Sequence, residues 1–220
     1  MAMASFQSSR VLSGHEGPTY CCAFEGTGTY VLTGGHDKSI KLFNTQTGSL
    51  VSTFSGHAWE VYDLSIASHG TTFLSGGGDR SLFLWDVASQ RIVRKFAGHH
   101  QRINAVTWGA HDHSVACSAS YDRSVRLWDV KSAGRFPLMI LEEAQDSVTS
   151  VQVFDKLIIT GSVDGYVRCY DIRRGRLTTD NIQVPVTNVC CTKDGLVYMV
   201  SSLDSTIRLI DYQSGALLNQ

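Results

Sequence analysis

Histidine, aspartate, serine and tryptophan recur along the chain in sets that resemble the parts of a catalytic site. One set is His57, Ser75, Asp79 and Trp85, and a second, about 42 residues further on, is His99, Ser118, Asp122 and Trp128. A catalytic triad needs a nucleophile beside a base. The chain lacks the G-x-S-x-G, H-E-x-x-H and phosphate-loop patterns that would support an enzyme. Regular spacing favours a structural role, so we predict no catalytic residue, no cofactor and no small-molecule substrate.

The run of His111, Asp112 and His113 contains side chains of the metal-ligand type. A structural zinc site needs four ligands, and no cysteine lies at a suitable spacing from this run. The run falls in the turn between two predicted strands. We therefore interpret it as a solvated loop and predict no metal site.

A second polar feature is the basic turn of Arg173, Arg174 and Arg176. The corresponding turns of the two preceding units carry further cations, namely Lys131, Arg135 and Arg91. One interpretation is a contact with an RNA backbone. A net charge of -1 and the shortness of the basic run favour a solvated turn instead.

The same residues define a repeat. Gly-His pairs stand at 14–15, 56–57 and 98–99. Aspartates in turn-like contexts follow at similar intervals, at Asp37, Asp79, Asp122, Asp164 and Asp204. A bulky residue comes six positions after each aspartate, namely Phe43, Trp85, Trp128, Tyr170 and Ile210. The chain therefore contains five units of about 42 residues, and the last two lack the Gly-His pair.

Each unit reads as short strands, such as 81–85 and 124–128, without a sustained helical period. A hydrophobic content of 43% over 220 residues is sufficient for a large core, and no apolar run is long enough to span a membrane. About 42 residues for four strands is typical of a β-propeller blade. We predict one all-β domain over 1–220, with units at about 14–55, 56–97, 98–140, 141–182 and 183–220.

The chain resembles the WD-repeat family in its Leu-Trp-Asp endings and in-register Gly-His pairs. The resemblance implies that each complete set forms a buried, hydrogen-bonded tetrad that stabilises a blade. It also implies partial sets in the other units, formed by His15, Thr33 and Asp37, by Thr160 and Asp164, and by Asp204 alone. The missing members are replaced by Phe43, Ala144 and Val200.

Members of this type close a ring of seven blades, so five units imply an incomplete ring. Residues 10–13 would then be the outer strand of the ring-closing blade. A closed five-bladed ring is the alternative. The six cysteines form no C-x-x-C motif, and we expect buried, reduced thiols.

The resemblance also places a partner-binding rim around the Gly-His loops and the aspartate turns. The candidates are Tyr20, His36, Trp59, Glu60, Tyr62, Arg102, Asn104 and Tyr121. Exposed Tyr, Trp and Arg are the residue types that dominate protein interfaces.

Several stretches, including 76–79 and 161–165, are similar to a scaffold branch of the family. That similarity implies a non-enzymatic scaffold for MAP-kinase cascade components, located in the cytoplasm and nucleus. The alternative is a WD-repeat subunit of a pre-mRNA splicing complex, with spliceosomal proteins as partners. The sequence does not separate the two.

Overall fold

The computed structural model describes residues 10–109, 113–192 and 194–219. These residues form five antiparallel sheets of four strands each, connected in chain order, and they contain no helix. We call the sheets blades 1 to 5. Blade 1 contains β1 (Thr19–Phe24), β2 (Tyr30–Gly35), β3 (Ser39–Asn44) and β4 (Leu50–Ser55). Blade 2 contains β5 (Val61–Ile66), β6 (Thr72–Gly77), β7 (Ser81–Asp86) and β8 (Arg91–Ala97).

The other three blades repeat this pattern. Blade 3 contains β9 (Ile103–Trp108), β10 (Val115–Ser120), β11 (Val125–Asp129) and β12 (Met139–Leu141). Blade 4 contains β13 (Val148–Phe154), β14 (Leu157–Ser162), β15 (Tyr166–Asp171) and β16 (Arg176–Asn181). Blade 5 contains β17 (Val186–Cys191), β18 (Val197–Ser202), β19 (Ile207–Asp211) and β20 (Leu217–Asn219).

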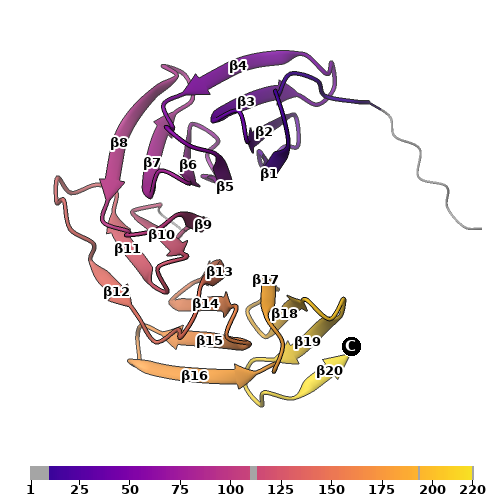
Figure 1. Ribbon diagram of the computed structural model, residues 1–220, viewed down its shortest axis with the longest axis vertical. Helices are drawn as coiled ribbons and strands as arrows, with labels where there is room; N and C mark the ends of the chain where they lie inside the picture. The colour runs from indigo at the N-terminus through magenta and orange to yellow at the C-terminus, as the bar shows by residue number, and fades with distance from the viewer. Residues whose placement is uncertain (1–9, 110–112, 193, 220) are drawn as a thin grey trace, which may run out of the picture.

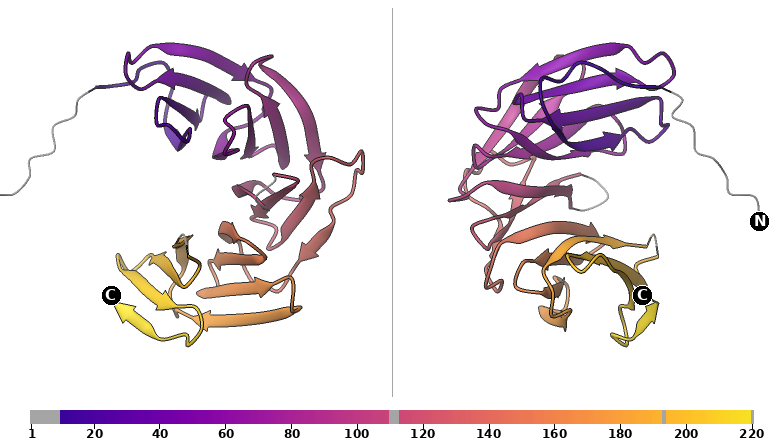
Figure 2. Two further views of the ribbon diagram at one scale, coloured as in Figure 1. Left: turned by 180° about the vertical axis from the view of Figure 1, so that it is seen from behind. Right: turned by 45° about the vertical axis from the view of Figure 1, so that its right-hand side comes forward.

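The blades follow one another around an open arc, with the first strand of each blade innermost and the fourth outermost (Figure 1). A gap separates blade 1 from blade 5, and the view from behind shows the same opening (Figure 2). The all-β prediction of five four-stranded blades in an unclosed ring is therefore confirmed. The number of blades in a closed ring stays a prediction. Residues 10–13, which were predicted as the outer strand of the ring-closing blade, form no strand here. An outer strand forms hydrogen bonds only with the neighbouring inner strand of its own blade.

The hydrophobic core lies between blades rather than within them. One cluster, for example, combines Leu32 and Ile40 of blade 1 with Val61, Phe73 and Trp85 of blade 2. Three further clusters fill the next three seams in the same way. A four-stranded sheet is too thin to bury its own apolar side chains, so each blade depends on its neighbours.

Blade 5 has a face that no neighbouring blade covers in this structure. Leu74 and Leu82 of blade 2 are both 0% exposed, because blade 3 packs on them. The strand register places Met199 and Ile207 at the same two positions in blade 5. They are 40% and 56% exposed.

The same geometry corrects our expectation of buried thiols. Cys117 and Cys169 are buried, and burial raises the pKa of each to about 12. Cys22 and Cys190 are exposed instead. They lie on the inner strands of the first and last blades, so the described chain places only one neighbouring blade beside each of those strands.

Candidate functional site

The turns between the second and third strands of all blades lie on one side of the arc, together with the loops that enter each first strand. We call this side the upper face, and the opposite side the lower face. The repeated His, Asp, Ser and Trp residues lie just beneath the upper face.

In blade 2 these residues form one continuous chain of hydrogen bonds. Trp85 Nε1 donates to Ser75 Oγ at 2.7 Å, Ser75 Oγ lies 2.6 Å from His57 Nε2, and His57 Nδ1 lies 2.8 Å from Asp79 Oδ2. A carboxylate only accepts, so Nδ1 carries the proton. In the neutral ring, Nε2 then accepts from Ser75. All donors are used within the blade, which leaves no free nucleophile or base.

Blade 3 repeats this arrangement. His99 Nδ1 lies 2.9 Å from Asp122 Oδ2, His99 Nε2 lies 2.8 Å from Ser118 Oγ, and Trp128 Nε1 donates to Ser118 Oγ at 2.9 Å.

Blade 1 lacks the indole donor, because Phe43 stands at that position. His15 Nδ1 still lies 2.9 Å from Asp37, and His15 Nε2 lies 2.8 Å from Thr33 Oγ1. Burial alone would raise the pKa of Asp37, but hydrogen bonds from His15 and Ser39 lower it to about 2. The turn aspartates of these blades therefore stay ionised near neutral pH.

Blades 4 and 5 hold the turn aspartate with an arginine, which the sequence analysis missed. Arg168 Nη2 lies 2.8 Å from Asp164 Oδ2, and Arg208 Nη2 lies 2.6 Å from Asp204 Oδ2. The hydrogen bonds from Arg208 help to lower the pKa of Asp204. The signal is present in the sequence as an arginine four residues after each aspartate. An arginine at this spacing does not by itself indicate a missing histidine, because blade 3 has both. There Arg126 follows Asp122 by four residues and His99 is also present.

We expect Asp79→Ala to lower the free energy of unfolding by about 1–3 kcal/mol, because it leaves the buried Nδ1–H group of His57 without an acceptor. Asp204→Ala is expected to cost less, since the Asp204 side chain is 29% exposed against 7% for Asp79. Chemical denaturation of both variants measures the difference. Equal losses would show that the turn aspartates act through local turn geometry alone.

Polar side chains also connect neighbouring blades at their inner strands. Asp63 of blade 2 accepts the backbone N–H of Val106 in blade 3 at 2.8 Å, and burial raises the pKa of its carboxyl to about 6. Asn104 of blade 3 donates to the carbonyl of Val148 in blade 4 at 2.8 Å. Asn104 was predicted as a rim residue, and the structure places its amide in this seam.

Four of the other predicted rim residues form a stack across blades 1 to 3. The rings of Tyr20 and Tyr62 have centroids 5.3 Å apart. The guanidinium of Arg102 lies 5.1 Å from the ring centroids of both Tyr62 and Tyr121. Arg102 Nε also donates to Asn104 Oδ1 at 3.1 Å, which fixes the guanidinium between the two rings. Tyr20 and Tyr121 remain 45% and 51% exposed.

The remaining candidates form a second group at the edge of blades 1 and 2. Trp59 is 58% exposed, and Lys38 Nζ lies 5.6 Å from its ring centroid. His36 Nε2 lies 3.7 Å from Glu60 Oε1. The aspartate turn of blade 1, which holds His36 and Lys38, therefore contacts the loop of blade 2 that holds Trp59 and Glu60.

Further basic side chains lie on the upper face, in the aspartate turns of blades 1 to 3. The residue after the turn aspartate has a left-handed backbone in each of blades 1 to 3, where it is Lys38, Arg80 or Arg123. All three side chains are exposed on the upper face. A hollow of about 380 Å³ between blades 2 and 3 is lined by Gly78, Arg80, Gln101, Arg102 and Tyr121. Sequence reasoning identified Arg102 and Tyr121 but missed Arg80, because Arg80 joins them only across the blade seam.

Comparison with known proteins agrees with this architecture. The family model described as WD domain, G-beta repeat matches residues 6–44, 48–86, 90–129 and 135–171. The chain belongs to the WD-repeat family. This WD-repeat chain is 32% identical to the WD repeat domain-containing protein 83 homolog of Dictyostelium discoideum, over 99% of the chain and 75% of that relative.

Two other relatives align with smaller parts of their own lengths. WD repeat domain-containing protein 83 of Rattus norvegicus is 48% identical to this WD-repeat chain over 38% of the chain and 27% of the relative. Autophagy-related protein 16 of Arabidopsis thaliana is 25% identical over 90% of the chain and 39% of the relative.

Metal-ligand clusters and membrane-spanning helices were looked for in the described part of this WD-repeat chain. That part contains no cluster of three His, Cys, Asp or Glu side chains able to hold a metal. Of the run considered above, His111 and Asp112 lie outside the described residues, and His113 Nε2 accepts the backbone N–H of Ser68 at 3.1 Å. Within the same described ranges, no helix is long and apolar enough to cross a membrane.

Proposed function

We propose that the chain is a non-enzymatic protein-interaction scaffold whose working surface is the upper face. The observation that carries this proposal is the stack of Tyr20, Tyr62, Arg102 and Tyr121. Rigid aromatic rings and an ordered guanidinium lose little conformational entropy on binding, and these residue types dominate the energetics of protein interfaces. Acidic side chains on a partner would complement Arg80 and Arg102 around the hollow.

The partners that we propose are components of a MAP-kinase cascade, in the cytoplasm and the nucleus. Support comes from the similarity of several stretches, such as 76–79 and 200–206, to the mitogen-activated protein kinase organizer, a WD-repeat scaffold. A subunit of a pre-mRNA splicing complex is the second candidate, and it rests on the same similarity. A co-precipitation with and without nuclease separates the two, because nuclease-sensitive recovery of partners favours the splicing particle.

We expect replacement of Tyr20, Tyr62 and Tyr121 by glutamate to abolish partner binding without unfolding the chain. The change breaks the ring contacts and places negative charges at positions 62 and 121 beside Arg102, whereas none of the three residues belongs to the seam clusters. Circular dichroism checks the fold, and quantitative co-precipitation checks binding.

The matched control replaces Val51, Val93 and Leu177 by glutamate. These residues are 49%, 60% and 40% exposed on the outer strands β4, β8 and β16. The control is expected to bind normally. Normal binding by the tyrosine variant would place the working surface elsewhere.

A further inference from the structure

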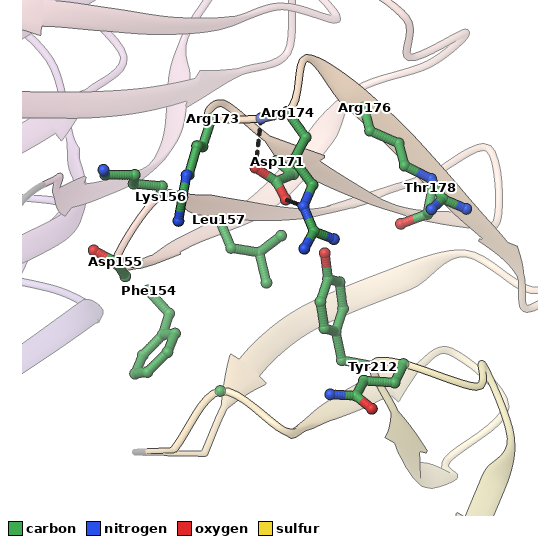
Figure 3. Close-up of a pocket in the computed structure, with 12 residues that line it drawn as sticks. Phe154, Asp155, Lys156, Leu157, Asp171, Arg173, Arg174, Arg176, Thr178 and Tyr212 are labelled. Carbon is green, nitrogen blue, oxygen red and sulfur yellow. Dashed lines mark hydrogen bonds and ion pairs between the residues drawn. The ribbon is translucent and has the colours of Figure 1, made fainter.

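A groove opens on the lower face between blades 4 and 5 (Figure 3). Its volume is about 470 Å³. Four turns line it, two from each blade. They are the β13–β14 and β15–β16 turns of blade 4, and the β17–β18 and β19–β20 turns of blade 5. The groove is thus formed at the ends of strands. It lies on the lower face between blades 4 and 5, whereas the stack lies on the upper face of blades 1 to 3.

Four cations surround this groove, all from blade 4. Lys156 comes from the first turn of that blade, Arg173 and Arg174 come from the second, and Arg176 is the first residue of β16. All four side chains are exposed. Figure 3 shows Arg173 beside Lys156, Arg174 directed toward the hydroxyl of Tyr212, and Arg176 at the far end of the groove. The four cations therefore lie along the blade 4 wall of the groove, and Tyr212 faces them from blade 5.

Little of this positive charge is neutralised within the chain. Arg174 Nε lies 3.7 Å from Asp171 Oδ2, and the Arg174 side chain is 75% exposed. Asp171 Oδ1 already accepts the backbone N–H of Arg174 at 2.9 Å, which closes the turn. Within the described ranges, Lys156, Arg173 and Arg176 have no acidic partner within 4.0 Å. A ligand that brings negative charge would supply the missing partner.

The walls of the groove are held in place by close packing. A side chain at Gly195 of blade 5 would come within 2.3 Å of the Phe154 ring, so the two blades meet tightly at this point. Tyr212 is half-buried, and burial raises the pKa of its hydroxyl, so it stays protonated and can donate a hydrogen bond. The groove therefore offers guanidinium groups, an ammonium and a phenol to one ligand.

The charge pattern favours a compact anion over a long one. Two carboxylates, Asp155 and Asp171, line the groove together with the four cations, so its positive charge is interrupted rather than continuous. A nucleic-acid strand needs a positive track over several successive phosphates. A phosphorylated serine or threonine carries close to two negative charges on a single group, and arginine clusters bind it through paired hydrogen bonds.

We propose that this groove binds a phosphorylated serine or threonine in a segment of a partner protein. Arg173, Arg174 and Arg176 contact the phosphate oxygens, Lys156 adds charge, and Tyr212 donates from the opposite wall. The inference rests on the proposed function only in taking a protein as the partner, since it concerns the opposite face of the arc.

The test measures fluorescence anisotropy of a labelled Gly-Gly-pSer-Gly-Gly peptide with the full 220-residue chain. We expect the peptide to bind and its unphosphorylated form to bind at least tenfold more weakly. The double variant Arg173→Gln/Arg176→Gln is expected to lose at least tenfold in affinity. Arg91→Gln, which changes an exposed arginine of blade 2, is expected to bind normally.

Two further arms make the result decisive. The glutamate variant of the three upper-face tyrosines is expected to bind the phosphopeptide normally, so a failure of the upper-face proposal stays distinguishable from a failure here. A labelled uridine dodecamer tests the nucleic-acid alternative. Equal binding of the two peptides, or tighter binding of the dodecamer through the same arginines, would overturn the proposal. Unchanged phosphopeptide binding by the double variant would also overturn it.

Discussion

Replacement of Trp85 by alanine should lower the free energy of unfolding by about 3–5 kcal/mol. The Trp85 side chain is 1% exposed and packs against Phe54 and Phe73 in the cluster between blades 1 and 2. Its indole N–H also donates to Ser75. The substitution therefore leaves a cavity in a seam and removes a donor from the buried chain of hydrogen bonds. Urea denaturation followed by circular dichroism measures the loss.

Trp85→Phe separates the two contributions. Phenylalanine keeps most of the apolar contact but has no N–H, as Phe43 shows at the same position in blade 1. We expect a loss of about 1 kcal/mol for this variant. Equal losses for the two variants would mean that the hydrogen bond, and not seam packing, dominates the contribution of Trp85.

The open face of blade 5 should cause the 220-residue chain to self-associate. Met199 and Ile207 are exposed there, although their counterparts in blade 2 are buried under the next blade. Unpaired apolar sheet faces tend to find partners in water. We expect analytical ultracentrifugation to give a mass above that of one chain, and the double variant Met199→Lys/Ile207→Lys to return it to that of a monomer.

Leu203→Lys is the matched control for this result. Leu203 is 67% exposed but lies in the upper-face turn of blade 5, away from the open sheet face. This control is expected to self-associate like the parent chain. A compact, protease-resistant monomer for the parent chain would contradict the prediction and would favour a ring that closes in solution.

The fold could be predicted because its determinants are local and repeated. A turn aspartate and a bulky residue six positions later fix the register of one hairpin, and the spacing of about 42 residues counts the blades. The interval alone does not give the shape of the arc. That shape depends on the angle between neighbouring blades, which side-chain packing in the seams determines.

The candidate sites were only partly predictable, because their contacts also join residues of different blades. Tyr20 and Tyr62 are residue types that suggest an interface, but their ring contact joins two blades. Arg208 escaped notice because an arginine at the same spacing from the turn aspartate, Arg126, also occurs in blade 3, where a histidine holds that aspartate. The lower groove needs turns from two blades, so the basic turn alone looked like a solvated one.

The central claim is that partners bind on the upper face, and site-specific photo-crosslinking tests it most directly. A benzophenone amino acid would replace Tyr121 in one variant and Val93 in another. Tyr121 is 51% exposed beside Arg102 on the upper face, and Val93 is 60% exposed on the outer strand β8. We predict that the probe at position 121 crosslinks to partner proteins in cells, whereas the probe at position 93 does not. Crosslinks at position 93 with none at position 121 would contradict the account.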